Sequence, residues 1–290
     1  MAIGKGWGLA AMGLSLVLVG SACRQEATPG GGGGGGGGTA APEITTIEEG
    51  ILTVGTDLPY PPFEYRDEGG ELTGFDVEIM DEIASRIGLE TEYVDSPFDT
   101  IFTDLANGQF DVVISGATIT PEREQEVNFS EPYFNSLQAL VAGDDSGIAS
   151  FDDLGEGDSV SVQTGTTGEI WAEENLQPNG VEIRAFPEYP PVYNALEAGQ
   201  VDAVVYDESS AIPETFNRPG LEVVDTVDTG EAYGIAVDPN NEDLLDAVNE
   251  ALQAMIDDGT YDQIFDGYPN CEEEEVETCM VPGGRVSEAA

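Results

Sequence analysis

Two kinds of apolar pattern alternate along the chain from Ile51 onward. Short runs of mostly apolar and β-branched residues, at 51–54 and 112–114, predict buried strands. Longer segments with apolar residues at helical spacing, at 74–87 and 241–258, predict amphipathic helices. Strands that alternate with helices are typical of an α/β fold with a mostly parallel sheet.

This order of elements occurs twice in the body of the chain. Residues 107–115 and 198–207 each run from a helix end through a glycine into an apolar strand that ends in polar residues. In open α/β sheets, ligands bind beyond the carboxyl ends of the strands. We therefore expect two lobes of related construction that share a cleft. Two apolar segments, 137–141 and 233–237, are expected to cross between the lobes as hinge strands.

The N-terminal part of the chain does not fit this alternation. A lysine near the start, an apolar run and three small residues together form an export signal over residues 1–22. The next residue, Cys23, resembles the lipidated cysteine of a bacterial lipoprotein. Gly20 stands where such proteins usually have a branched aliphatic residue, so cleavage after Ala22 without lipidation is the alternative. Residues 23–42 include nine consecutive glycines and predict a flexible tether.

The end of the chain is acidic and rich in turn-forming residues, and we expect it to be peripheral. Cys271 and Cys279 flank a run of four glutamates there, and in an exported protein they predict a local disulfide. A metal site is the alternative, but two thiols without histidine are too few to close a zinc shell. The expected division is lobe 1 at residues 43–138 and 238–270, lobe 2 at 139–237, and an acidic C-terminal tail at 271–290.

The charge of the chain limits its possible partners and functions more than its hydropathy does. The chain has 58 Asp+Glu against 8 Lys+Arg, which gives a formal net charge of −50, and it has no histidine. Such acidity opposes binding to nucleic acid or to anionic membrane surfaces. It also destabilises a compact protein at low salt, whereas molar salt reduces the Debye length to about 3 Å, so we expect a halophilic source. Without histidine, triad-type hydrolysis and most zinc chemistry are disfavoured.

Polar groups and one cation follow the predicted strand at 112–114. Ser115, Gly116 and Thr118 supply hydroxyl groups and a closely approachable backbone, and Arg123 supplies a planar fork that suits a carboxylate. A solvated surface salt bridge is the alternative for an arginine taken at random. Because cations are so scarce in this chain, a role in binding an anion is the better interpretation.

Four segments carry a resemblance to a known family. They combine a Gly-Thr-Asp strand end and a Tyr-Pro-Pro-Phe turn with a Gly-Phe-Asp-Val helix start, a Thr-Ile-Thr-Pro-Glu-Arg segment and a Phe-Ser-Glu-Pro-Tyr segment. They lie at residues 55–63, 74–77, 118–123 and 129–133. The chain resembles the extracellular solute-binding proteins of polar amino-acid ABC transporters, family 3, over residues 51–268. This resemblance implies an α/β, two-lobed, periplasmic-binding-protein-like (type II) fold with two hinge crossings.

The resemblance also implies roles for the strand-end residues. Arg123 would hold the α-carboxylate of an amino acid, with help from Thr118 and from backbone N–H groups near Gly116 and Thr167. Asp207 would receive the α-ammonium group from the opposite lobe. These roles agree with the chemistry of a zwitterion, which needs a cation and an anion at a fixed separation.

The side chain of the ligand would meet a second set of residues. By the resemblance, the rings of Tyr60 and Phe98 clamp it, although core packing is the alternative for both, and we expect Phe63 to be core. Asp57 and Gln163 stand where the family reads the side chain. Asp57 favours a cationic ligand without settling the matter, and Gln163 often has lysine as its counterpart, so its neutrality disfavours acidic ligands.

The function that the resemblance implies is the substrate-binding component of an ABC importer. Such a protein captures a polar amino acid, neutral or basic, by closing its lobes and delivers it to a membrane permease. We expect an extracytoplasmic, lipid-anchored monomer that uses no cofactor, no metal and no nucleic acid. Periplasmic dehydratases that act on prephenate- or arogenate-like acids, and ligand sensors that feed a receptor, use the same fold and stay open as alternatives. No constellation of catalytic residues favours an enzyme.

Overall fold

The computed structural model describes residues 44–273, 276 and 278–286. The expected export signal at 1–22, the lipidation site Cys23 and the tether at 23–42 lie outside the described residues. Within the described part, no helix is both long enough and apolar enough to cross a membrane.

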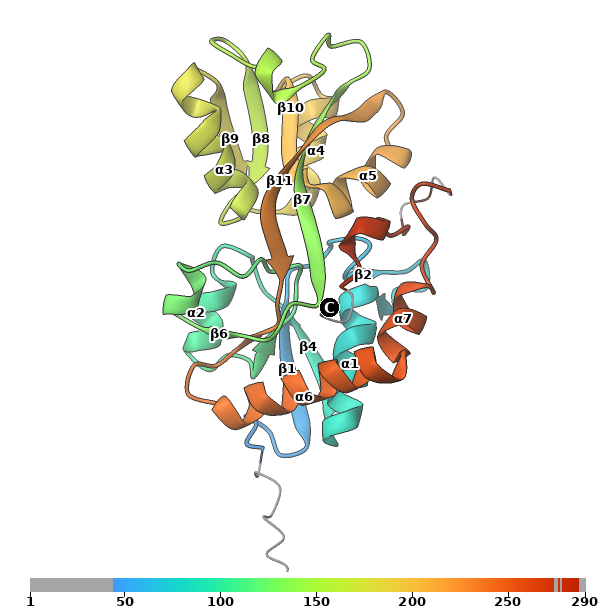
Figure 1. Ribbon diagram of the computed structural model, residues 1–290. Helices are drawn as coiled ribbons and strands as arrows, with labels where there is room; N and C mark the ends of the chain where they lie inside the picture. Colours follow the sequence, from blue (N-terminus) through green and yellow to red (C-terminus); the bar gives the residue numbers. More distant parts are fainter. Residues whose placement is uncertain (1–43, 274–275, 277, 287–290) are drawn as a thin grey trace, which may run out of the picture. The chain divides into compact units, whose positions relative to one another are not determined.

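The first of two large sheets belongs to lobe 1 and lies in the lower half of Figure 1. Its strands, in spatial order, are β4 (Glu90–Asp95), β1 (Ile51–Thr56), β5 (Val112–Val113), β12 (Ala236–Val237) and β6 (Asn128–Phe129). β1 pairs in parallel with β4 and β5, as the alternation of strands and helices predicts, whereas β12 is antiparallel to both of its neighbours. The helices of this lobe are α1 (Phe75–Ile87), α2 (Ile101–Ala106), α6 (Glu242–Asp258) and α7 (Thr260–Phe265).

The second sheet belongs to lobe 2. Its strands, in spatial order, are β11 (Leu221–Tyr233), β7 (Phe134–Gly143), β10 (Ala203–Asp207), β8 (Ser159–Gln163) and β9 (Glu182–Phe186). β8 pairs in parallel with β9 and β10, while β7 is antiparallel to β10 and β11. The helices of this lobe are α3 (Thr167–Asn175), α4 (Tyr189–Glu197) and α5 (Glu208–Phe216).

Local sequence explains where the helices of both lobes begin and end. The side chain of Asn241 accepts a hydrogen bond from the backbone N–H of Leu244 and so caps the start of α6. Gly88 follows α1 with a φ of 81°, a left-handed conformation that glycine adopts without steric cost. Two short strands, β2 (Tyr65–Arg66) and β3 (Leu72–Thr73), form a hairpin beside α1.

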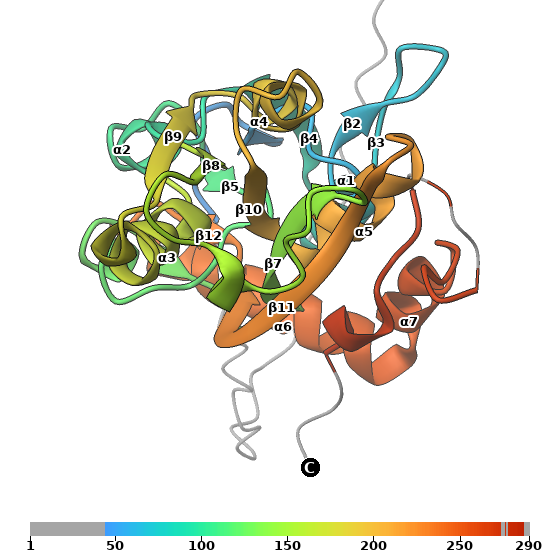
Figure 2. The same ribbon diagram turned by 90° about the horizontal axis from the view of Figure 1, so that it is seen from above.

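The strands β7 and β11 connect the two lobes. They pair antiparallel from Phe134 opposite Tyr233 to Gly143 opposite Leu221, with an irregular stretch between Val227 and Glu231. They lie side by side in both views and run from lobe 2 into lobe 1 (Figures 1 and 2). Our placement of the first crossing, at 137–141, falls within β7. Our placement of the second crossing, at 233–237, runs from the last residue of β11, in the sheet of lobe 2, to the end of β12, in the sheet of lobe 1.

The C-terminal segment is not peripheral throughout, which corrects our expectation. Cys271 and Cys279 form a disulfide with a Cα–Cα distance of 5.0 Å. Met280 and Val281 are only 1% and 6% exposed and belong to the core of the protein. Gly284 packs so closely on a core phenylalanine that a Cβ atom there would lie 1.9 Å from the ring. The acidic composition of the segment concealed these apolar residues.

Candidate functional site

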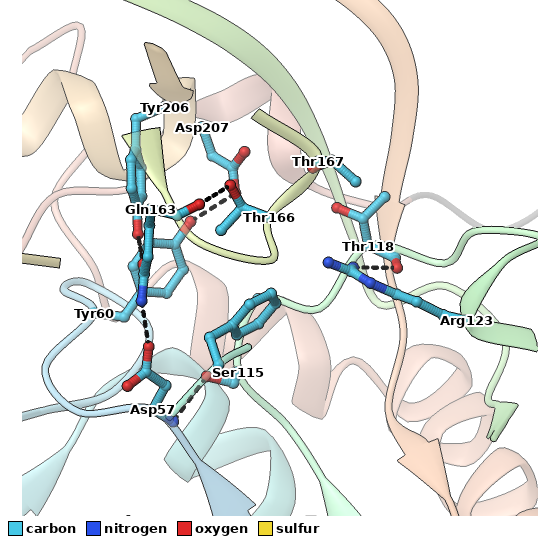
Figure 3. Close-up of a pocket in the computed structure, with 12 residues that line it drawn as sticks. Asp57, Tyr60, Ser115, Thr118, Arg123, Gln163, Thr166, Thr167, Tyr206 and Asp207 are labelled. Carbon is cyan, nitrogen blue, oxygen red and sulfur yellow. Dashed lines mark hydrogen bonds between the residues drawn. The ribbon is translucent and has the colours of Figure 1, made fainter. Parts of the chain in front are cut away.

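A pocket with an empty volume of about 320 Å³ lies between the two lobes, at the carboxyl ends of strands from both sheets (Figure 3). Every residue that the sequence predicted for the ligand site lines this pocket. Thr166 and Tyr206 line it as well and were not predicted. The residues that the sequence predicted thus come together around one pocket.

On the lobe 1 side, the ends of β1 and β5 form the floor of the pocket. The hydroxyl of Ser115 accepts a hydrogen bond from the backbone N–H of Asp57 at 3.0 Å and so joins the two strand ends. Gly116 has a φ of 51°, and a Cβ atom at this position would lie 2.5 Å from the ring of Tyr60. Only glycine satisfies both conditions. Phe63, expected as core, is fully buried beneath this floor.

Arg123 is held in place without being neutralised. Its guanidinium donates to the backbone oxygens of Thr118, at 2.7 Å, and of Gly165, at 3.1 Å. It also lies over the rings of Phe98 and Phe102, at 5.1 and 4.7 Å from their centroids. Among the described residues, no carboxylate forms an ion pair with it. Burial lowers the pKa of Arg123 to about 10, so it stays charged at neutral pH and can bind an anion.

On the lobe 2 side, the pocket is lined by the ends of β8 and β10. Gln163, the last residue of β8, donates across the cleft to Asp57 at 2.6 Å and accepts a hydrogen bond from the hydroxyl of Tyr206. Thr166 caps the start of α3 by accepting from the backbone N–H of Glu169 at 3.2 Å. The N-terminal end of α3, which Thr167 begins, therefore faces the pocket and favours a negative charge there.

Asp207 is the most heavily hydrogen-bonded acid of the pocket. Its carboxylate accepts from the hydroxyls of Tyr60 at 2.9 Å and Tyr233 at 2.8 Å, and from the amide of Gln138 at 2.5 Å. Burial, together with the negative charge of Glu231, nevertheless raises the pKa of Asp207 to about 7. A cation beside this carboxylate would restore its ionised form.

Asp57 is in a similar condition at the other end of the pocket. Burial raises the pKa of Asp57 to about 7, although the hydrogen bond from Gln163 acts in the opposite direction. The negative charges of Asp95, Glu188 and Asp99 raise this pKa further. Two acids of the pocket therefore lack the positive charge that would keep them ionised.

Glu231 is a functional candidate that sequence reasoning missed. It lies on β11, and one of its oxygens accepts from the hydroxyls of both Thr118 and Thr167, at 2.8 and 2.7 Å. Its other oxygen accepts from Gln138 at 3.1 Å. Since a threonine hydroxyl has a single hydrogen to donate, a ligand carboxylate that binds these two threonines has to draw them away from Glu231. In a chain with 58 acidic residues, no sequence signal singles this one out.

One donor that we expected for the ligand carboxylate already has a partner within the protein. We expected backbone N–H groups near Gly116 to help bind a carboxylate, but the N–H of Gly116 itself donates to Asp76 at 2.9 Å. The buried carboxylate below the loop takes this donor because a buried anion requires hydrogen bonds. The N–H of Gly116 is thus engaged, whereas Arg123, the two threonine hydroxyls and the start of α3 face the pocket as candidates for binding an anion.

The arrangement places a free guanidinium on lobe 1 and a buried carboxylate on lobe 2. A cation and an anion so placed suit the two charged groups of one small zwitterion, and Asp57 and Gln163 line the same pocket. Within the described residues, no cluster of acids or thiols is arranged to hold a metal ion.

The sequence pattern of the family described as "Bacterial extracellular solute-binding proteins, family 3" matches residues 52–270. The chain belongs to this family. It is thus an extracytoplasmic solute-binding protein and not an enzyme, and the two-lobed type II fold is that of its structural relatives. This confirms the family and the fold that the four sequence segments predicted.

Several members of this solute-binding family are similar over most of the chain. The L-cystine-binding protein TcyJ of Escherichia coli K12 is 37% identical over 220 residues, which cover 73% of this chain and 80% of TcyJ. An ancestral arginine-binding protein bound to arginine is 40% identical, with a TM-score of 0.71, and covers 75% of this chain and 97% of its own. The ancestral amino acid-binding protein AncCDT-1, a precursor of cyclohexadienyl dehydratase, is 37% identical, with a TM-score of 0.69, over 75% of this chain and 95% of its own.

Proposed function

We propose that this solute-binding protein captures an amino acid between its lobes and delivers it to the permease of an ABC importer. The observation that carries the proposal is the position of Arg123, which faces the pocket without an acidic partner among the described residues while Asp207 lies across the cleft. In a chain of this acidity, a guanidinium left without a carboxylate is available for one that the ligand brings.

Within that proposal, a basic amino acid fits the charges of the pocket better than a neutral polar one. The pocket is lined by two acids, Asp57 and Asp207, and one cation, Arg123. A third acid, Glu231, accepts hydrogen bonds from two threonines of the lining. A zwitterion adds no net charge to this set, whereas a basic amino acid adds one positive charge. The end of its side chain would lie near Asp57, whose pKa of about 7 shows that its negative charge is poorly compensated.

A thermal-shift screen of the amino acids in molar salt tests the function. A ligand at one hundred times its Kd stabilises the native state by about 2.7 kcal/mol, which gives a measurable rise in Tm. Arg123→Ala should abolish the shift and leave the unliganded protein folded. Arg184→Ala is the matched control, because Arg184 is an exposed arginine paired with Glu182 at 2.9 Å and should leave the shift unchanged.

Retention of the shift in Arg123→Ala would refute the role of Arg123 as the carboxylate ligand. Absence of a shift with every amino acid would refute the proposed ligand class. A shift with basic amino acids alone would identify Asp57 as the residue that reads the side chain, and a shift with glutamine alone would assign that role to Gln163.

We also propose that residues 1–22 export the protein, that Cys23 carries a lipid which anchors it, and that the folded part acts as a monomer. The small residues before Cys23 and the glycine-rich tether after it support this arrangement. The high acidity supports a halophilic source, because molar salt screens the repulsion among the carboxylates.

A further inference from the structure

Two acids are fully buried beneath the floor of the pocket, and the binding of a zwitterion does not use them. Glu64 precedes β2, and Asp76 is the second residue of α1; both are 0% exposed. Glu64 accepts a hydrogen bond from the hydroxyl of Ser115. Asp76 accepts from the N–H of Gly116 at 2.9 Å and from the hydroxyl of Tyr133 at 2.8 Å.

The remaining oxygens of this pair show that it holds a proton. One oxygen of Glu64 and one oxygen of Asp76 are buried and receive no hydrogen bond, and the charge of Asp76 acts on Glu64. Two ionised carboxylates would leave both of these buried oxygens without a donor, whereas a single proton lets one acid donate to the other. Burial raises the pKa of both acids, as expected for two carboxyl groups that share one apolar site.

The surroundings indicate which acid keeps the proton. Asp76 receives two donors and lies in the first turn of a 13-residue helix, where the helix dipole favours a negative charge. Glu64 receives one donor, from Ser115. The hydroxyl of Thr56 lies near Glu64 but has no partner at hydrogen-bond geometry. The proton therefore belongs on Glu64 and the charge on Asp76.

We propose that Glu64 is a positioning residue whose protonated carboxyl group, hydrogen-bonded to Asp76, holds Ser115 and Gly116 in place at the floor of the ligand site. Ser115 lies between the acid pair and the backbone N–H of Asp57, at 3.0 Å, and Gly116 is tied directly to Asp76. Loss of the proton would place two charges in the core and loosen the strand ends that line the pocket. This inference concerns the amino-acid site proposed above and rests on it for its effect on ligand affinity.

The charged and titratable groups that face the pair come from several elements. Asp57 raises the pKa of Glu64, and Glu64 in turn raises that of Tyr133. Burial raises the pKa values of the tyrosines around Asp76 and so keeps them neutral, and among the described residues no cation has a marked effect on the pKa of either acid. These tyrosines are Tyr93, Tyr133, Tyr261 and Tyr268. The acid pair is thus the group whose protonation can change in this region, apart from Asp57 in the pocket.

The first test compares the wild type with Glu64→Gln in urea unfolding at pH 5, 6 and 7 in molar salt. Glutamine can accept from Ser115 and donate to Asp76, but it cannot lose a proton. Because the folded wild type binds one proton more than the unfolded chain above pH 4.5, its folding equilibrium constant should fall about tenfold per pH unit relative to that of the variant. Between pH 5 and pH 7, the difference should reach about a hundredfold.

The exposed residue Glu68 provides the matched control, since Glu68→Gln removes a carboxylate from the neighbouring hairpin without touching the pair. Its unfolding curves should run parallel to those of the wild type at every pH. Parallel curves for Glu64→Gln as well would overturn the proposal. A Glu64→Gln protein that fails to fold would overturn it too, because glutamine supplies both hydrogen bonds.

The second test measures amino-acid affinity and separates this inference from the proposed function. Glu64→Gln should bind within about threefold of the wild type at pH 6, and a loss of tenfold or more in this variant would argue against the positioning role. Glu64→Leu, which removes both hydrogen bonds, should weaken binding at least tenfold. If the wild type binds no amino acid, the proposed function fails, yet the unfolding curves still decide whether the pair holds a proton.

Discussion

The affinity for the ligand should depend steeply on pH, because Asp57 and Asp207 both have a pKa of about 7 in the protein alone. A protonated carboxyl group cannot balance a cation, so binding of an ammonium group to Asp207 requires the release of a proton below pH 7. Each group that has to ionise then raises Kd about tenfold for every pH unit below its pKa.

The size of the effect distinguishes the two ligand classes. For a neutral amino acid, which needs Asp207 alone, lowering the pH from 7 to 5 should raise Kd by about a hundredfold, or about 2.7 kcal/mol at 1.36 kcal/mol per unit. A basic amino acid also needs Asp57 ionised, so the same change should raise its Kd by up to about ten thousandfold. The slope of log Kd against pH therefore gives the number of carboxyl groups that must lose a proton for the ligand to bind.

Isothermal titration calorimetry between pH 5 and pH 8 in molar salt measures this slope. Buffers with different ionisation enthalpies report the number of protons released on binding. Asp207→Asn should reduce the slope by one for either ligand class, whereas Asp57→Asn should reduce it only for a basic ligand. A Kd that stays constant from pH 5 to pH 7 would show that neither acid is protonated in the free protein and would refute the reasoning.

The same two acids affect folding in the opposite direction. Since their pKa values are raised on folding, their contribution to stability is complete below pH 3.8 and is lost as the pH rises through about 7. Low pH thus stabilises the free protein through Asp57 and Asp207 and at the same time lowers its affinity for the ligand.

Two further predictions concern single residues. Gly116→Ala should destabilise the protein by about 1–3 kcal/mol through its clash with Tyr60 and should also impair ligand binding. Thermal unfolding measures this loss, and the control is Gly199→Ala, where φ is 63° and no atom lies within 4 Å of the added Cβ. An equal loss of stability in both variants would contradict the prediction. Cys23→Ser should move the protein from the membrane fraction to the soluble fraction of the cells that produce it, and unchanged fractionation would exclude a lipid anchor at this residue.

The ligand site was predictable because strand ends carry a local signature. One apolar strand is followed at once by Ser115 and Gly116, and another ends in Asp207. Each pattern identifies the carboxyl edge of a sheet without knowledge of the other lobe. Tyr206 escaped detection because it continues an apolar strand, and nothing local shows that its hydroxyl reaches Gln163. Glu231 escaped because only the pairing of β7 with β11 brings it to the pocket.

In two other segments, the average composition did not predict which residues are buried or paired. The C-terminal segment is acidic as a whole, so its buried residues, such as Met280, were not recognised from sequence. The long strand β11 was not predicted either, because it carries many polar residues and holds its position by hydrogen bonds to β7 rather than by apolar burial. In both cases the average polarity of a segment concealed the few residues that make its contacts.

The C-terminal segment also determines where the molecule can bend. Phe134, the first residue of β7, pairs with Arg285, whose guanidinium is held by Asp262 and Asp266 on and just after α7. The first residue of one connecting strand is thereby fixed to lobe 1, and we infer that lobe 2 rotates about this fixed point. On this inference, the backbone bends in β7 after Phe134, where β7 faces the irregular stretch of β11 that ends at Glu231. This irregular stretch and the carboxylate that accepts from Thr118 and Thr167 thus lie at the same place on the chain.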